Sequence, residues 1–520
     1  MEQFPAEADA VWVLGDGLTR EVGPLAAAPE GTRVLLIEAT GFARRHPYHP
    51  HKLTLLFAAM RHLARECEAA GHEVVTERAA TFREGLSAYF ERHPEETLVA
   101  MRPASGREAE AAALRAAVDD AGGELLLSRN ESFICDPETF DEWAGDDDSY
   151  RHESFYRFLR RETGYLMDGD EPVGGAWNYD EENRETPPPG WEPPEPPRFE
   201  PDELTRETEA WVRETFSGGY EEPPYGGDWA DPGPFRWPVT RTEARTALDA
   251  FVDDRLATFG DYQDAMVDGE WAMSHALLSP ALNLGLLHPR EVIEAALAAH
   301  EARDLPLNAV EGFLRQVLGW REFVRHVYRR SMPGLAQAND LGATEPLPEA
   351  YWTGDTRMAC LADAVEGVRT RGYSHHIQRL MVLSNLGLLV GVDPAALNRW
   401  FHAAYVDAYH WVTTPNVVGM GLFASDVLST KPYAASGNYV DRMGDYCDGC
   451  VYDVDETTGD GACPFNALYW DFLDRNEEKL RSNHRMGLVY GHLDRKSDAE
   501  RAAIRERAAT LRARFRDGEV

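Results

Sequence analysis

The sequence predicts an α/β N-terminal domain with a parallel, Rossmann-like sheet, followed by a large all-α C-terminal domain. Over residues 10–130, short apolar runs alternate with helical patterns. An acidic and Pro-rich stretch follows, and from about residue 240 onward only helical patterns of comparable strength appear. We therefore expect a domain over 1–140, an interdomain linker over 141–240 and a helical domain over 241–520.

The N-terminal domain contains five apolar runs that are typical of buried strands, at 11–15, 32–38, 72–77, 96–102 and 123–128. Helical patterns at 52–67 and 107–122 lie between them, which predicts a parallel sheet with right-handed crossovers. Ligands of such sheets sit at the carboxyl ends of the strands. Asp16 follows the first run and Glu38 ends the second, so both are candidate ligand contacts. A helix cap or loop carboxylate is the alternative for each.

The linker region has a composition that is unsuited to regular structure. Its segment 185–203, "ETPPPGWEPPEPPRFEPDE", is Pro-rich. The later helices are punctuated by Gly, Asn or Pro. The last one, "SDAERAAIRERAATLRARF", is amphipathic and opens with a Ser/Asp cap.

The charge of the chain is strongly negative. The formal net charge is −37, and nearly all of the 52 cationic residues are arginines. Lysine occurs only at Lys52, Lys431, Lys479 and Lys496. This composition indicates adaptation to high salt, which screens the self-repulsion of such a surface. Plain solubility is the alternative, and the charge neither supports nor excludes a nucleic-acid substrate.

Nothing in the sequence predicts a membrane protein or a disulfide framework. The N-terminus "MEQFPAEADA" lacks an apolar segment, and no run of 18 apolar residues occurs. We therefore expect a cytoplasmic protein. Six cysteines without a secretory signal argue for metal binding rather than disulfides.

Three cysteines share one acidic loop, "YCDGCVYDVDETTGDGACPF", at 446–465. Cys447 and Cys450 form a C-x2-C pair, and Cys463 is followed by proline. Cys360 is the candidate fourth ligand. Structural zinc usually takes two close C-x2-C pairs. A single pair with a Cys-Pro ending favours an iron–sulfur cluster slightly, so both metals stay open on spacing alone.

Several long, collinear motifs resemble the iron–sulfur bacterial cryptochromes and photolyases, the prokaryotic (6-4) photolyase branch. They include "YWTGDTRMAC", "HHIQRLMV", "DAYHWVTTPNVVGM", "TKPYAASGNYVDRMGDYCDGC", "ACPFNALYWDF", "GFLRQVLGWREF" and "SHALLSPALNLGLL". The resemblance covers nearly the full chain. It implies the photolyase/cryptochrome fold, with FAD in the helical domain and a [4Fe–4S] cluster on Cys360, Cys447, Cys450 and Cys463. It also implies a lumazine-type antenna, 6,7-dimethyl-8-ribityllumazine, in the α/β domain, with Asp16 and Glu38 as contacts.

The "HHIQRLM" segment carries the implied catalytic residues. His376, Arg379 and Leu380 share one helical face by their i, i+3, i+4 spacing. The resemblance implies that His376 is the proton donor and His375 a supporting residue. Histidine suits this role because its ordinary pKa lies near neutrality. Leu380 stands where other (6-4) photolyases have a second histidine.

The resemblance also implies the cofactor contacts. An ion pair between Arg379 and Asp407 would lie beside the flavin, and the "SHALLSP" segment would bind phosphate and ribityl groups. On a regular helix Arg315 and Arg321 do not share one face, so not all polar residues of 311–321 can contact the cofactor. The implied FAD contacts are His275, Leu278, Ser279, Glu311, Trp320, Arg321, Arg379, Asp407, Tyr409 and Thr413.

Electron-transfer and DNA contacts complete the implied site. Trp352 and Trp400 resemble tryptophans that pass electrons to the photoexcited flavin. Phe401 stands where the family often has Tyr and is harder to oxidise, so the donor chain can differ. Arg184 and Tyr433 are candidate contacts to DNA or the lesion.

The leading hypothesis is a light-driven lyase that repairs (6-4) pyrimidine photoproducts by electron transfer from photoexcited reduced FAD. The alternative is a blue-light photoreceptor that signals without repair. A third hypothesis is a light-independent iron–sulfur or zinc nucleic-acid binder that holds no flavin. We expect UV-damaged DNA as the partner and a monomeric protein, since the sequence carries no oligomer signal.

Overall fold

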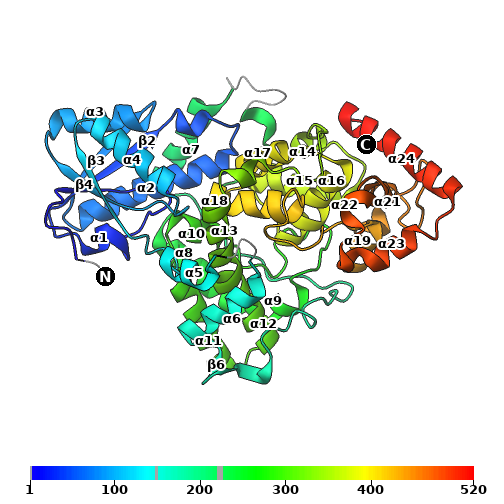
Figure 1. The fold of residues 1–520 in the computed structure, drawn as a ribbon. Coiled ribbons are helices and arrows are strands. Elements are labelled where there is room, and N and C mark those ends of the chain that lie inside the picture. The colour runs from blue at the N-terminus through cyan, green and yellow to red at the C-terminus, as the bar shows by residue number, and fades with distance from the viewer. Residues whose placement is uncertain (1–2, 147–149, 219–226) are drawn as a thin grey trace.

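The computed structural model describes residues 3–146, 150–218 and 227–520 (Figure 1). The N-terminal α/β part, in blue, and the C-terminal helices, in red, lie at opposite ends of the molecule. The elements between them, in green and yellow, form the body of the protein and carry the site described below.

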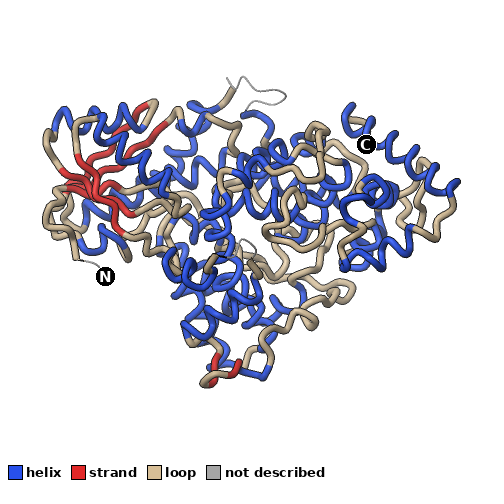
Figure 2. The backbone as a smooth tube through the Cα atoms, in the orientation of Figure 1, coloured by secondary structure: helices blue, strands red, loops and turns tan. Residues whose placement is uncertain are grey.

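The N-terminal sheet confirms the predicted parallel arrangement. Its five strands are all parallel and follow the order β3-β2-β1-β4-β5. In Figure 2 they appear as the large group of red segments at one end of the molecule. The strands are β1 (Ala10–Trp12), β2 (Arg33–Ala39), β3 (Glu73–Ala79), β4 (Thr97–Met101) and β5 (Glu124–Ser128).

Both faces of this sheet are buried, which explains why its central strands are continuous apolar runs. Leu35 and Ile37 pack in a cluster with Leu86 and Tyr89 of α3 (Phe82–Arg92). Val34 and Leu36 pack in another cluster with residues of α2 (Pro50–Ala69). Two further helices belong to this part of the chain, α1 (Gly23–Ala27) and α4 (Glu108–Asp120).

The region 141–240 differs from the predicted linker because part of it is helical. As expected, the Pro-rich residues 185–202 lie outside helices and strands. The helix α6 buries Phe155, Tyr156 and Leu159, and α7 packs against α2, so both contribute to the core. The elements of this region are the end of α5 (Pro137–Ala144), α6 (His152–Thr163), the hairpin β6 (Met167–Asp168) and β7 (Glu171–Pro172), and α7 (Glu203–Phe216).

In the C-terminal part the described residues form helices joined by loops and no named strand, as predicted. Its final helix has the predicted N-cap, because Ser497 and Glu500 form a capping box. Among the described residues, none of the helices is both long and apolar enough to cross a membrane. The α-helices are α8 (Arg241–Asp254), α9 (Leu256–Tyr262), α10 (Ser279–Leu284), α11 (Pro289–Arg303), α12 (Leu307–Leu314), α13 (Glu322–Ser331), α14 (Ala350–Thr353), α15 (Ala359–Arg371), α16 (Asn385–Val390), α17 (Pro394–Ala404), α18 (His410–Thr414), α19 (Gly437–Met443), α20 (Tyr446–Gly449), α21 (Pro464–Arg475), α22 (Glu477–Leu480), α23 (Gly487–Leu493) and α24 (Asp498–Asp517).

Three π-helical segments interrupt these helices. They are η4 (Arg315–Arg321), η6 (Gln378–Ser384) and η7 (Pro415–Gly421). π-Helical turns are rare and occur frequently at functional sites. All three segments contribute side chains to one large cavity in the helical part of the protein.

Candidate active site and cysteine site

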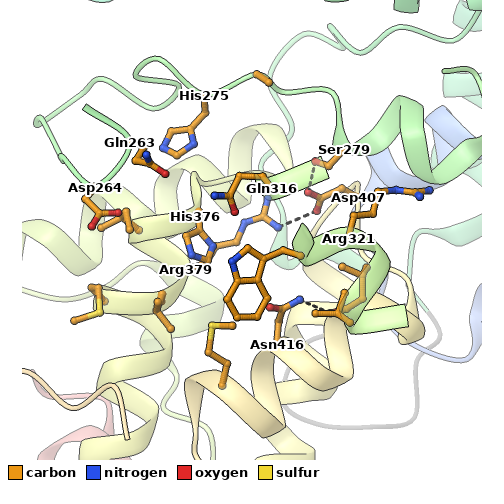
Figure 3. A pocket seen from close by; sticks show the side chains of 18 of the residues that line it. Gln263, Asp264, His275, Ser279, Gln316, Arg321, His376, Arg379, Asp407 and Asn416 are labelled. Atoms are coloured by element: carbon orange, nitrogen blue, oxygen red, sulfur yellow. Dashed lines mark hydrogen bonds and ion pairs between the residues drawn. The ribbon is translucent and has the colours of Figure 1, made fainter. Parts of the chain in front are cut away.

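A cavity of about 1040 Å³ lies among the helices of the C-terminal part. It brings together most of the predicted FAD contacts, His376 and both candidate lesion contacts, several of which are labelled in Figure 3. Cofactor sites are typically mostly apolar clefts with a few convergent polar groups, and this cavity has that character. The predicted residues that line it are Arg184, His275, Leu278, Ser279, Trp320, Arg321, His376, Arg379, Asp407, Thr413 and Tyr433.

The Arg379–Asp407 ion pair is formed as predicted. Arg379 Nη1 lies 3.0 Å from Asp407 Oδ1, and Ser279 Oγ donates to Asp407 Oδ2 at 2.6 Å (Figure 3). Asn283 Nδ2 holds the Asp407 backbone carbonyl at 2.9 Å. Asp407 raises the pKa of the Arg379 guanidinium, against the opposing effect of burial. The pair therefore fixes a cation and an anion side by side at the cavity wall.

The His376 side chain is solvent-accessible and lines the cavity. It shares the cavity wall with Arg379 and Leu380, which confirms the common face predicted from their spacing. Burial, and secondarily the positive charge of Arg379, lowers the pKa of His376 to about 4. The imidazole is therefore neutral at neutral pH in the protein without ligands.

His375 lies behind the cavity wall. Its ring stacks on that of His275, with 4.9 Å between the ring centroids. Burial lowers the pKa of both rings, that of His275 to about 3. This position fits the supporting role predicted for His375, because its ring backs a histidine that lines the cavity.

The "SHALLSP" segment approaches the cavity in an unusual backbone conformation. Leu277 has a φ of +59°, a left-handed conformation that is strained for a branched side chain. Such residues cluster at ligand clamps. Leu277 and Leu278 line the cavity together with Ser279, the first residue of α10.

Polar atoms of this cavity lack partners within the described protein. Arg321 Nε and His275 Nε2 are buried and make no hydrogen bond there. Burial lowers the pKa of Arg321 to about 10. Buried polar groups normally have partners, so these atoms fit a site that binds a polar, anionic cofactor such as FAD.

Of the residues predicted to contact the cofactor from the segment 311–321, some line the cavity and one does not. Arg315, Trp320 and Arg321 all line the cavity, although a regular helix would place the two arginines on different faces. Glu311 lies outside the lining, where it accepts from the Tyr156 hydroxyl at 2.8 Å and the Tyr179 backbone N–H at 3.2 Å. Glu311 is thus bound by protein groups.

Tyr409 and Thr413 also take different positions. Thr413 lines the cavity, whereas Tyr409 is not among its lining residues. The Tyr409 hydroxyl instead donates to the backbone carbonyl of Gly15 at 3.4 Å. Tyr409 therefore links the helical part to the loop after β1.

Sequence reasoning missed an acidic residue in the cavity. Asp264 lies near Gln263 and His376 (Figure 3), and burial raises its pKa to about 6. Arg184, a predicted DNA contact, pairs with Asp180 at 2.9 Å in the same lining. No local motif marks Asp264, so only its position in the fold could identify it.

A row of aromatic rings leads away from the cavity. Phe401 and Tyr405 line the cavity, and both rings contact Trp400, with centroids 5.0 and 5.8 Å from its ring. Trp352 follows at 6.5 Å from Trp400. Trp229, which the sequence did not single out, lies 5.2 Å beyond Trp352. The two predicted electron donors are thus neighbours, with two aromatic rings between Trp400 and the cavity.

The four predicted cysteine ligands line one small cavity. Cys360 comes from α15, and Cys447, Cys450 and Cys463 come from the loop around α20. Burial, together with the three neighbouring thiols, raises the pKa of Cys360. The donor set therefore fits a group whose positive charge stabilises several thiolates.

The spacing of these thiols bears on the choice of metal. Among residues 3–146, 150–218 and 227–520, no three His, Cys, Asp or Glu side chains are arranged to hold a single metal ion. A zinc ion needs its sulfur ligands about 2.3 Å from one point, whereas an iron–sulfur cluster spreads four thiolates around a larger body. Both groups are bound by cysteine thiolates, so the donor types of this site fit either one.

The predicted antenna contacts have protein partners. Both Glu38 oxygens accept from Arg61, at 2.6 and 2.9 Å, and Arg78 adds a bond at 2.8 Å. Asp16 accepts from the Ala104 backbone N–H at 2.8 Å, and burial raises its pKa. Glu38 therefore serves an internal ion-pair network and has no unpaired oxygen to offer a ligand.

The comparisons with known proteins agree with this fold. Residues 11–222 match the family described as "Deoxyribodipyrimidine photo-lyase-related protein". A protein of Agrobacterium fabrum (strain C58 / ATCC 33970) named (6-4) photolyase is 40% identical over 513 residues, which cover 96% of this chain and 98% of the relative. This chain therefore belongs to the photolyase family of enzymes.

Two solved structures share the fold. A bacterial class III photolyase from Agrobacterium tumefaciens has a TM-score of 0.55 and 19% identity, and the match covers 99% of both chains. A cryptochrome from Synechocystis sp. PCC6803 has a TM-score of 0.54 and 15% identity, over 85% of this chain and 89% of the other. The chain has the photolyase/cryptochrome fold, an α/β domain followed by a large helical region.

Proposed function

We propose that this protein repairs (6-4) pyrimidine photoproducts in DNA in a light-dependent reaction that uses FAD. The observation that carries this proposal is the convergence of His376 and the Arg379–Asp407 pair on one cavity. The 40% identity to a protein named (6-4) photolyase supports the choice of lesion.

The cavity residues would hold the cofactor in the helical domain. Arg321 would supply hydrogen-bond donors, the Ser279 oxygen an acceptor, and the Arg379–Asp407 pair a fixed dipole beside the cofactor. When bound, reduced FAD supplies a light-absorbing electron donor. The lining apolar residues exclude water from that donor.

His376 is the proposed proton donor. Its pKa of about 4 in the protein without ligands means that the ring is neutral at neutral pH and lacks the acidic proton of the imidazolium form. Negative charge beside an imidazole favours its protonated form. We infer that the anionic cofactor and DNA phosphates raise the pKa of His376, so that Nδ1 and Nε2 are both protonated when the lesion is bound.

The lesion would enter the cavity from the side of Arg184 and Tyr433. Tyr433 is 38% exposed, and Tyr439 and Arg442 line the same part of the cavity. Enzymes that act on a base take it out of the helical stack. Aromatic rings and cations at this opening suit a flipped base and the phosphates beside it.

The remaining cofactors belong to this proposal as well. We infer that the four-cysteine site holds a [4Fe–4S] cluster and that Trp352 and Trp400 pass electrons inward to keep the flavin reduced. Phe401 and Tyr405 both lie between Trp400 and the cavity, and Tyr405 is the ring that would carry the last step, because phenylalanine is much harder to oxidise. We also infer a lumazine-type antenna in the α/β domain. Asp16 is better placed than Glu38 to contact it, because both Glu38 oxygens already accept hydrogen bonds from arginines.

The proposal is tested by a repair assay on oligonucleotides that carry one defined lesion. We expect light-dependent restoration of a (6-4) photoproduct in high-salt buffer, no restoration in the dark, and little restoration of a cyclobutane dimer. Protein that visibly holds reduced FAD but restores neither lesion would favour the photoreceptor alternative. Protein that never binds flavin would favour a light-independent nucleic-acid binder.

A further inference from the structure

A buried hydrogen-bond network joins the cysteine site to the helix that carries His376. Tyr446 lines the cysteine cavity and directly precedes Cys447. Asp363 lies one turn after Cys360 on α15. The Tyr446 hydroxyl donates to Asp363 Oδ2 at 2.5 Å. Two of the segments that carry cysteine ligands therefore meet at this pair of side chains.

Gln378 connects this pair to the active-site helix. Its Nε2 donates to Asp363 Oδ2 at 2.9 Å and to the Tyr446 hydroxyl at 3.0 Å. Its Oε1 accepts from the His375 backbone N–H at 3.2 Å. Gln378 and Tyr446 are 1% and 2% exposed, so water does not compete for these bonds.

The bond to His375 is a helix cap. The helix begins at His376, which makes His375 the N-cap and Gln378 the third helical residue. A Gln at this position that reaches back to the N-cap N–H is one half of a capping box. The cap thus holds the first turn of the helix, where His376 lies.

The network also sets which way the Gln378 amide points. A carboxylate only accepts hydrogen bonds, so Asp363 selects the NH₂ end of the amide and leaves the oxygen to face His375. Without Tyr446 and Asp363, the amide can turn and the cap is lost.

We propose that Tyr446, acting through Gln378, is a positioning residue that couples the cysteine site to the placement of His376 in the cavity. The inference rests on the proposed function insofar as His376 acts on a lesion. It assigns the cysteine site a structural task, which is to hold Tyr446 and Asp363 where they orient the helix cap.

The test compares Tyr446→Phe with a matched control, Tyr452→Phe, in the full holoprotein. Tyr452 lines the same cysteine cavity and is 5% exposed, but its hydroxyl has no hydrogen-bond partner among the described residues. Both variants remove one hydroxyl beside the same cysteines, and only Tyr446→Phe breaks the network. The visible absorption of the cluster is recorded for both variants to check that they retain it.

Hydrogen exchange is the first readout. We expect the amides of His375 to Gln378 to exchange about fivefold faster in Tyr446→Phe, the factor expected from loss of one helix cap. Tyr452→Phe should exchange like the unmodified protein. Equal exchange in all three proteins would overturn the proposal.

Repair kinetics give the second readout. Tyr446→Phe should lower the light-driven repair rate several-fold and leave dark binding of the lesion unchanged, because a misplaced His376 affects the reaction rather than affinity. The paired variant Gln378→Glu with Asp363→Asn exchanges donor and acceptor, and should restore the rate lost in Gln378→Glu alone. The coupling would be contradicted if the paired variant does not recover the rate and if amide exchange in Tyr446→Phe equals that of the unmodified protein.

Two outcomes separate this inference from the proposed function. If the unmodified protein repairs no lesion, the proposed function fails, and the exchange comparison still decides the positioning role. If Tyr446→Phe loses the cluster, Gln378→Met decides, because Gln378 is remote in sequence from every cysteine. If the amides of residues 375–378 exchange as slowly in Gln378→Met as in the unmodified protein, the proposal is overturned.

Discussion

The Arg379–Asp407 pair shows how single residues define this site. Both charges are fixed by further bonds, from Ser279 to Asp407 and from Arg379 Nε to the Ser374 carbonyl at 2.7 Å. The spacing of "HHIQRLM" predicted the shared face of His376 and Arg379, and family resemblance supplied the partner Asp407. Asp264 and Tyr405 carried no local signal, because only the folded chain brings them to the cavity.

Replacing Asp407 should weaken cofactor binding. In Asp407→Asn the guanidinium of Arg379 loses its counter-charge and the Ser279 hydroxyl loses an ionised acceptor. Breaking a buried charge pair costs several kcal/mol, so we expect FAD retention to fall about 30-fold or more. The measurement is the dissociation constant of FAD by fluorescence titration.

A variant of the same cavity serves as the control for this prediction. Asp264→Asn removes a carboxylate of the same cavity whose charged neighbours are Arg184 and Asp180 rather than Arg379. It should bind FAD like the unmodified protein. If Asp407→Asn binds FAD as tightly as the unmodified protein, the Arg379–Asp407 pair does not support cofactor binding.

At the scale of elements, the periodicity of apolar residues predicted the strands and most helices. It did not predict α6 or the π-helical segments. The five strands were evident because a sheet buried on both faces needs continuous apolar runs. The helix α6 was missed because its Arg- and Glu-rich sequence lies in an acidic region interpreted as a linker. Arg315 and Arg321 were assigned to different faces by α-helical spacing, whereas the chain between them is π-helical.

The contact between α14 and α17 forms the electron route that we expect. Trp352 and Trp400 lie on these helices, 6.5 Å apart. Trp400→Phe should abolish most light-driven reduction of oxidised flavin by an external thiol, because phenylalanine is much harder to oxidise. Absorbance of the flavin during blue illumination measures the rate.

Trp470→Phe is the control, since Trp470 contacts Tyr469 and Lys496 rather than this row. It should leave the reduction rate unchanged. A Trp400→Phe protein that is reduced as fast as the control would show that electrons reach the cavity by another route. Trp352→Phe, one ring further out, should slow the reduction less.

At the scale of the whole molecule, many buried histidines make the fold sensitive to acid. Burial lowers the pKa of these side chains below the ordinary value of 6.5, that of His51 to about 4. Asp264 opposes this trend, because its pKa is raised. The affected histidines are His49, His51, His152, His275, His288, His326, His375, His376, His402 and His410.

The free energy of unfolding should therefore fall as the pH drops from about 6.5 to about 4. Across this range the unfolded chain binds protons that the folded histidines do not, so acid favours unfolding. A buried histidine shifted like His51 contributes about 2–3 kcal/mol to this loss. Urea titrations across this pH range, at constant high salt, measure the effect.

The variant His51→Gln should flatten this dependence, because one of the shifted groups is removed. Gln can retain the hydrogen bond that His51 Nε2 makes to the Gly233 carbonyl. An unfolding free energy that stays constant or rises toward acid pH would contradict the account. The salt concentration is kept high and constant because the net charge of −37 makes the protein repel itself, and high salt screens this repulsion.

The central claim is that His376 donates a proton during light-driven repair of a (6-4) photoproduct. The most direct test is single-turnover repair by His376→Asn, with Met381→Leu as an apolar control from the same cavity wall. We expect His376→Asn to bind FAD and lesion but to repair about 10²–10⁴ times more slowly. Met381→Leu should repair like the unmodified protein. Repair by His376→Asn at the unmodified rate would contradict the assignment of His376.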